Sequence, residues 1–177
     1  MLQAVDKEVL DQVNTWLAQG QSCWLATVVE TWGSSPRPIG SLLTCNHDGV
    51  VVGSLSGGCV EDDLLEKLTA GELAAEGAQF FQYGITAKET EKFGLPCGGH
   101  LYIVVEPLHP DEETCAHFTA LTQSLTQRQC ARRVVDLQQG STSIVTDCGF
   151  APLQWDGTAP VSYTHLRAHE TVLDIVC

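Results

Sequence analysis

The residues best suited to chemistry lie between Gly53 and Asp63, where the sequence reads Gly-Ser-Leu-Ser-Gly-Gly-Cys-Val-Glu-Asp-Asp. A run of valines comes before this stretch, and apolar residues at helical spacing follow it from Val60 to Leu68. The pattern predicts a strand, a glycine turn and a helix that begins near Cys59. Glycines let a ligand approach the backbone closely. The unpaired N–H groups and the positive dipole end of a first helical turn favour the thiolate form of a cysteine placed there.

The same stretch also has a purely structural interpretation. Most cysteines are small buried apolar residues, and a Gly-Gly pair is often only a turn. The acids Glu61, Asp62 and Asp63 suit the helix dipole, but they repel an anion and raise the pKa of a nearby thiol. We therefore expect a poorer phosphate cradle than a neutral glycine loop would form.

A second glycine–cysteine turn runs from Phe93 to His100 and contains Cys97, Gly98 and Gly99. It leads directly into an apolar strand pattern, so two turns of similar composition could face one pocket. The Cys97-x-x-His100 spacing also matches half of a zinc site, but a structural zinc ion needs four ligands. Because only irregularly spaced cysteines are left to complete the set, we assign no metal site.

The loop over residues 30–40 is rich in turn-forming residues and contains Ser34, Ser35 and Arg37. A guanidinium matches phosphate geometry, so these side chains could hold an anionic group. The alternative is a solvated loop arginine, and the residues alone favour neither interpretation.

Composition excludes several classes of function. The chain has 177 residues, a net charge of −13 and eight cysteines. Nucleic-acid binding needs a basic surface, which this chain lacks, and an acidic protein is a poor ligand for an acidic membrane. No apolar run reaches the roughly 20 residues of a membrane span, and the charged N-terminus does not resemble a secretory signal. We expect a cytoplasmic protein with reduced thiols.

The pattern of elements predicts an α/β fold, with α+β as the alternative. We expect one domain over residues 1–150, with helices packed on a mixed sheet of about six strands. An Asp-Gly turn at Asp48 predicts a hairpin. The expected helices cover residues 4–19, 59–68 and 111–128, and the expected strands cover 23–29, 41–45, 49–52, 79–84, 101–106, 131–137 and 143–146.

The C-terminal residues do not resemble the rest of the chain. Residues 161–171, Val-Ser-Tyr-Thr-His-Leu-Arg-Ala-His-Glu-Thr, match the translation of a common transposase sequencing adapter. We therefore expect 161–177 to be an artefactual, disordered tail, 151–160 to begin a linker, and the gene to continue beyond residue 160.

Three segments together resemble the XdhC/CoxI family, whose members serve the molybdenum cofactor of xanthine dehydrogenase, carbon monoxide dehydrogenase and related enzymes. They occur in the order and spacing of that family, and the resemblance covers about residues 5–147. Members usually carry a second, Rossmann-like domain, which we expect to be missing here because the chain has no G-x-G-x-x-G motif. The segments are Gly33–Arg37, Gly53–Glu61 and Phe93–Gly99.

The resemblance implies a chaperone that binds the molybdopterin form of the cofactor transiently and delivers it to an apo molybdenum hydroxylase. A cysteine desulfurase would be a second partner, and whether the chain forms a homodimer is left undecided. Cys59 and Cys97 would ligate or handle sulfur, and the phosphate would be held by the backbone of both glycine turns with Ser34, Ser35 and Arg37. The acids from Glu61 onward would face away or bind pterin N–H groups. The implied cofactor-binding residues are Ser34, Ser35, Arg37, Ser56, Gly57, Gly58, Cys59, Glu61, Cys97, Gly98 and Gly99.

Two other functions compete with this one. Cys59 or Cys97 could serve a thiol-dependent sulfur-transfer or oxidoreductase enzyme, which a depressed thiol pKa would favour. Alternatively, both turns could only shape a protein-docking face. We expect an accessory protein rather than an enzyme, with no catalytic residue assigned.

Overall fold

A computed structural model describes residues 4–32, 37–84, 100–127, 129, 131–136, 141–145, 161–169 and 172–175. Its central strand is β1 (Cys23–Trp32). The side chains of β1 alternate between two separate apolar clusters: Cys23 and Leu25 belong to one, and Trp24, Ala26 and Val28 to the other. Because successive side chains of a strand point to opposite faces, β1 is buried on both sides, and helices must cover both faces of its sheet.

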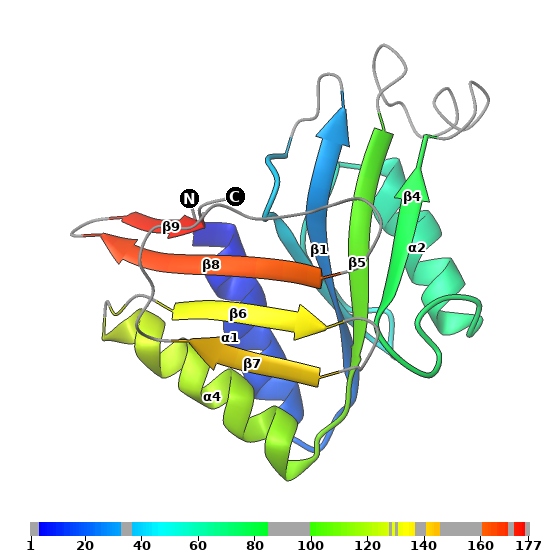
Figure 1. The fold of residues 1–177 in the computed structure, drawn as a ribbon. Helices are drawn as coiled ribbons and strands as arrows, with labels where there is room; N and C mark the ends of the chain where they lie inside the picture. The colour runs from blue at the N-terminus through cyan, green and yellow to red at the C-terminus, as the bar shows by residue number, and fades with distance from the viewer. Residues whose placement is uncertain are drawn as a thin grey trace.

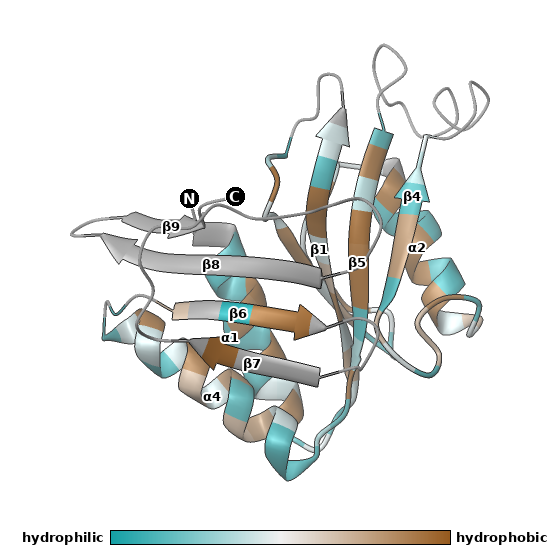
Figure 2. Cartoon of the chain, in the orientation of Figure 1, coloured by the Kyte–Doolittle hydropathy of each residue, from teal (hydrophilic) through white to brown (hydrophobic). Residues whose placement is uncertain are grey.

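The sheet that contains β1 has five strands in the order β3-β2-β1-β5-β4, and every neighbouring pair is antiparallel. Figure 2 shows apolar residues along the middle of β1 and β5 and more hydrophilic residues where β1 ends and β5 begins. The other strands are β2 (Leu42–Asn46), β3 (Val51–Gly53), β4 (Gln79–Tyr83) and β5 (His100–Leu108).

Two helices pack on one face of this sheet. In α1 (Ala4–Ala18), the apolar residues from Val9 to Leu17 recur at helical spacing and are buried. The second helix is α4 (Glu112–Thr126), which contributes Phe118 to the same cluster. The side-chain amide of Asn14 joins the two helices, since it donates to the Phe118 carbonyl at 3.2 Å.

The opposite face is covered by α2 (Cys59–Thr69), which lies beyond β4 in Figure 1. Its residues Val60, Leu64 and Leu68 are buried against Trp24 and Ile103 of the sheet. No helix among the described residues is both long and apolar enough to cross a membrane.

A second sheet, in the order β7-β6-β8-β9, lies beside α1 and α4 (Figure 1). The two strands expected over 131–137 and 143–146 are present as β6 (Ala131–Asp136) and β7 (Ser141–Val145), which pair antiparallel. Residues expected to be a disordered tail form β8 (Val161–His169) and β9 (Val172–Ile175), and β8 pairs with β6. Strand pairing through backbone groups makes little demand on sequence, and an open strand edge accepts many segments, so this pairing does not bear on where the tail sequence comes from.

The predicted α/β class, helices packed on a sheet, is confirmed. The main sheet differs in detail: it has five strands rather than about six, and its pairs are antiparallel rather than mixed, as in the α+β alternative. β1 also continues to Trp32, into the segment predicted as loop, because β5 pairs with it as far as His100.

The hairpin of β2 and β3 leads into the glycine turn. Gly53, the last residue of β3, fixes how the chain leaves the hairpin. Gly53 has φ +96°, and a Cβ there would lie 2.3 Å from the Leu42 carbonyl oxygen and 2.5 Å from Val9. Only glycine fits such a close backbone approach.

We predict that Gly53→Ala lowers the free energy of unfolding by on the order of 3 kcal/mol, through overpacking and an unfavourable φ. Gly71→Ala is the matched control, because Gly71 also has a positive φ (+72°) but no atom within 4 Å of its Cβ position. It should lose only about 1 kcal/mol. Urea denaturation of both variants checks this, and equal losses would contradict it.

Candidate functional site

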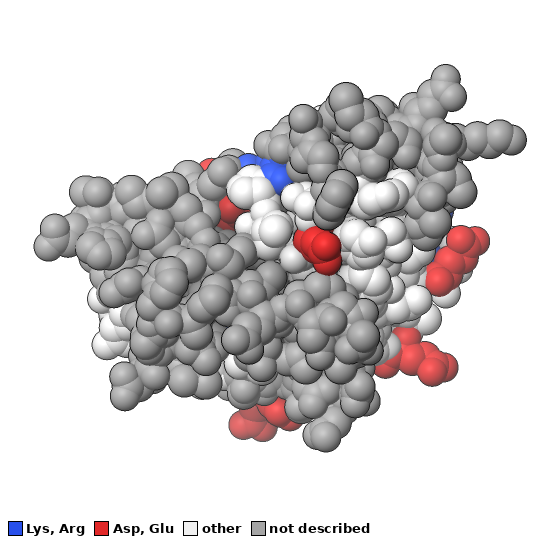
Figure 3. Space-filling view, turned by 45° about the horizontal axis from the view of Figure 1, so that its top comes forward, with Lys and Arg blue, Asp and Glu red and all other residues white. Residues whose placement is uncertain are grey.

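Strand ends that flank the motif segments point in one direction in the five-stranded sheet. β1 ends at Trp32, which pairs with His100 at the start of β5. β4 also ends at this end of the sheet, at Tyr83, which pairs with Leu101. β3 runs in the same direction and ends at Gly53, level with Ala26 in the middle of β1. The described surface in this direction carries more acidic than basic residues (Figure 3).

The first glycine turn is organised by the carboxylate of Glu61. This residue lies in the first turn of α2 and reaches back over the loop that precedes the helix. It accepts six hydrogen bonds, four from backbone N–H groups and two from serine hydroxyls. The donors are Leu55 N at 2.8 Å, Ser56 N at 2.9 Å, Gly57 N at 3.1 Å, Gly58 N at 3.0 Å, and the hydroxyls of Ser54 and Ser56, both at 2.9 Å.

These donors keep Glu61 ionised. Partial burial on its own would raise the pKa of the Glu61 carboxyl, but the hydrogen bonds from Ser56, Leu55 and Ser54 outweigh it and lower the pKa to about 2. Consecutive N–H groups that converge on one point form an anion-binding nest. In this protein, the anion in the nest is the chain's own side chain.

Arg37 joins this turn to the rest of the site. Its Nε donates to the Ser54 carbonyl at 3.2 Å, and its guanidinium lies 3.0 Å from the Asp6 carboxylate of α1. Asp6 is 1% exposed and also accepts the Leu42 N–H at 2.9 Å. The structure thus brings the predicted residues Arg37, Ser56–Cys59 and Glu61 together, and Arg37 contacts protein groups.

A second group of ionisable residues lies beneath α2. Tyr83, the last residue of β4, is 2% exposed. Burial, reinforced by the charges of Asp63 and then Glu61, raises the pKa of Tyr83. Asp63 in turn forms an ion pair with Lys67 at 2.8 Å. These contacts place the end of β4, from which the second glycine–cysteine turn departs, against the helix that begins at Cys59.

The remaining predicted site residues are described only in part. Ser34, Ser35, Cys97, Gly98 and Gly99 lie outside the described residues. Cys59 is the first residue of α2. Within the described residues, no three His, Cys, Asp or Glu side chains are grouped as metal ligands. Cys45, one of the irregularly spaced cysteines left to complete a zinc site with Cys97 and His100, is 1% exposed in the core, and burial raises its pKa to about 12.

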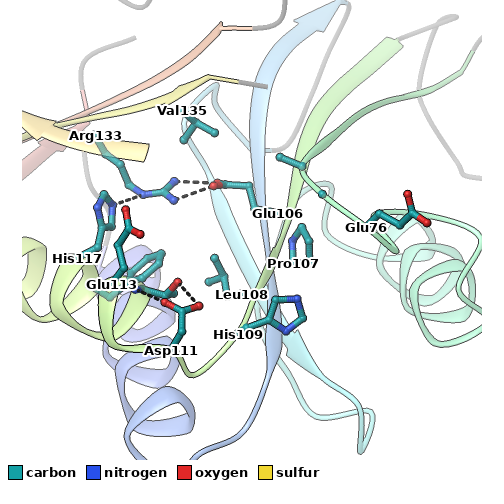
Figure 4. A pocket seen from close by; sticks show the side chains of 14 residues that line it. Glu76, Glu106, Pro107, Leu108, His109, Asp111, Glu113, His117, Arg133 and Val135 are labelled. Atoms are coloured by element: carbon teal, nitrogen blue, oxygen red, sulfur yellow. Dashed lines mark hydrogen bonds and ion pairs between the residues drawn. The ribbon is translucent and has the colours of Figure 1, made fainter. Parts of the chain in front are cut away.

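Sequence reasoning missed a buried charge cluster at the junction of the two sheets. A pocket of about 340 Å³ lies there, between β5, the start of α4 and β6. In Figure 4, the Arg133 side chain extends from β6 toward Glu106 of β5, with His117 of α4 beside it. Arg133 binds both carboxylate oxygens of Glu106, each at 2.7 Å.

His117 completes the cluster by accepting a hydrogen bond from Arg133 Nε at 2.9 Å. Burial, and then the charge of Arg133, lower the pKa of His117 to about 4, so its ring is neutral at physiological pH. His117 is half-buried beside Arg133 and is therefore part of this cluster. The available signal in the sequence was one acidic residue, Glu106, within the apolar run of β5.

Comparison with known proteins points to one family. Residues 16–84 match the sequence profile of the XdhC and CoxI family, and this match contains both Arg37 and the Glu61 turn. Over these residues the chain is similar to the XdhC and CoxI family.

Two curated proteins are similar to this chain over much of its length. A probable xanthine dehydrogenase subunit of Bacillus subtilis is 27% identical over 149 residues, which cover 80% of this chain and 44% of the relative. The molybdenum cofactor insertion chaperone PaoD of Escherichia coli is 30% identical over 115 residues, which cover 60% of this chain and 33% of the relative. The chain thus spans less than half the length of either relative.

A solved structure supports the fold of this chain. The crystal structure of a xanthine dehydrogenase from Bacillus halodurans aligns with a TM-score of 0.60 at 22% sequence identity. The alignment covers 95% of this chain and 44% of the other. At this identity, the likeness shows a shared fold.

We predict that Glu61→Gln destabilises the chain by roughly 1–3 kcal/mol at pH 7, because a neutral amide cannot accept from all six donors. A folded-state pKa below the ordinary value stabilises the native state above the unfolded pKa and ceases to do so as pH falls through the folded pKa. The contribution of Glu61 should therefore disappear between about pH 4.5 and about pH 2. Chemical denaturation across that range should show that the free energy of unfolding falls less steeply with decreasing pH for Glu61→Gln than for the wild-type chain. Equal slopes for the two chains would contradict the low pKa of Glu61.

Proposed function

We propose that this chain is the N-terminal part of a maturation factor that binds the molybdenum cofactor and delivers it to an apo molybdenum hydroxylase of the xanthine dehydrogenase type. The match of residues 16–84 to the XdhC and CoxI family supports the class of function. One relative is named as a molybdenum cofactor insertion chaperone, and another as part of a probable xanthine dehydrogenase. A cysteine desulfurase as second partner, a homodimer and a cytoplasmic location rest on the sequence expectations alone.

The observation that carries this proposal is the contact between residues of two motif segments. Arg37 donates to the Ser54 carbonyl, and the Ser54 hydroxyl donates to Glu61. Tyr83, the last described strand residue before the third segment, interacts electrostatically with Glu61. These described residues, far apart in the sequence, thus lie in one region, as a ligand site requires.

The described residues fit the cofactor in one respect and not in another. Gly57 and Gly58 are exposed, and a Cβ built on Gly58 would meet no atom within 4 Å, so a flat ligand has room to approach there. A soft thiolate at Cys59 would supply sulfur ligation or sulfur handling when the cofactor is bound. The N–H groups that were expected to hold its phosphate, however, already donate to Glu61.

The test is binding of isolated molybdenum cofactor to the full chain, followed by size exclusion and cofactor quantification. We expect saturable binding that Cys59→Ala weakens by about tenfold or more, equivalent to about 1.4 kcal/mol. Cys115→Ala is the matched control, because Cys115 is a half-buried thiol of α4 that packs against the α1 side of the core.

Either of two results would overturn this proposal. One is a chain that is folded by circular dichroism but binds no cofactor. The other is binding that Cys59→Ala and Cys115→Ala weaken equally, because the effect would then come from loss of a thiol in general rather than from the turn.

A further inference from the structure

The starting observation is a mismatch between the glycine turn and an anionic ligand. A helix N-terminus preceded by a glycine turn usually offers its N–H groups to a phosphate. In this chain, the four consecutive N–H groups from Leu55 to Gly58 all donate to the Glu61 carboxylate. The nest has the geometry of an anion-binding site, and the Glu61 carboxylate already occupies it.

Displacing that anion would be costly. An incoming phosphate would have to break six hydrogen bonds to Glu61, several of them from backbone groups that stabilise the charge. It would also bring more negative charge next to Asp62, an exposed acid in the first turn of α2, and to the partly neutralised Asp63. Like charges in one site oppose each other, so the turn disfavours a phosphate.

The surrounding contacts hold the nest in this state. The Ser54 hydroxyl donates to Glu61 and accepts the Gly57 N–H at 3.0 Å. The Ser54 carbonyl is held by Arg37, whose guanidinium is anchored by Asp6. The turn, the start of α2 and the N-terminal part of α1 therefore form one connected polar network.

We propose that Glu61 is a positioning residue and serves as the internal anion of the 54–58 turn. Its carboxylate excludes the phosphate of the ligand from this nest. It also fixes Gly57, Gly58 and the start of α2 for contact with an uncharged part of the ligand. This inference rests on the proposed cofactor-binding function for the identity of the ligand. The occupied nest itself is a property of the chain alone. The phosphate is accordingly bound by groups other than the N–H donors of residues 55–58.

The first experiment is chemical rescue of Glu61→Ala in the full chain, read by thermal unfolding without cofactor. Removing the carboxylate leaves the N–H nest empty, and we expect the Tm to fall by roughly 4–8 °C. Formate or inorganic phosphate at millimolar concentration should restore at least half of that shift. Asp62→Ala is the matched control, because it removes one acid from the same helical turn without removing a nest acceptor, and it should gain no more from the anions than the wild-type chain does.

Two outcomes would overturn the inference. In the first, phosphate raises the Tm of the wild-type chain as much as that of Glu61→Ala, which would show that the nest is open to anions with Glu61 present. In the second, Glu61→Ala unfolds at the wild-type Tm, which would show that the six hydrogen bonds do not hold the turn.

A second readout separates this inference from the proposed function. Cofactor binding by Glu61→Ala should be at least fivefold weaker than wild type, and formate should restore it; Glu61→Asp, which keeps the charge on a shorter side chain, should fall between the two. If the wild-type chain binds no cofactor but anions still restore the Tm of Glu61→Ala, the proposed function is wrong, and Glu61 is still the internal anion of the turn. If formate restores the Tm but competes with cofactor in Glu61→Ala, the ligand's anionic group uses the nest, and the exclusion fails.

Discussion

The ionised Glu61 carboxylate is the interaction on which the organisation of this site depends. An unpaired backbone N–H costs free energy when it is shielded from water, and a glycine turn before a helix presents several at once. The Glu61 carboxylate accepts hydrogen bonds from four of these N–H groups and from two serine hydroxyls. Through Ser54 the same carboxylate is linked to Arg37 and Asp6, so the local turn becomes part of the tertiary structure.

The sheet supplies the frame for this network. Because β1 is buried on both faces, α1 and α4 cover one face of the layer and α2 covers the other. The hairpin of β2 and β3 ends at Gly53, and the close approach of Gly53 to Leu42 and Val9 fixes where the turn begins. The buried pair of Arg133 and Glu106 ties the second sheet to β5, away from the glycine turn.

Much of the frame could be predicted from sequence, because it depends on local patterns. Helical spacing in α1, the Asp-Gly hairpin and the strand–glycine–helix order around Cys59 each arise within a few residues, and the structure has all three. Which way Glu61 points could not be predicted, since an acid in the first turn of a helix also suits the dipole when it is solvated. The pair of Arg133 and Glu106 joins residues 27 apart, and no local pattern specifies such a contact. The pairing of 161–169 with β6 was missed for the same reason.

The most direct test of this account is the pKa of the Glu61 carboxyl, measured by following its side-chain ¹³C resonance against pH by NMR. A Glu61 pKa of about 2 is expected if the carboxylate occupies the N–H nest. A Glu61 resonance that titrates at the ordinary glutamate value of about 4.5 would mean that the nest does not hold Glu61 in solution, and it would make the turn a candidate phosphate site again.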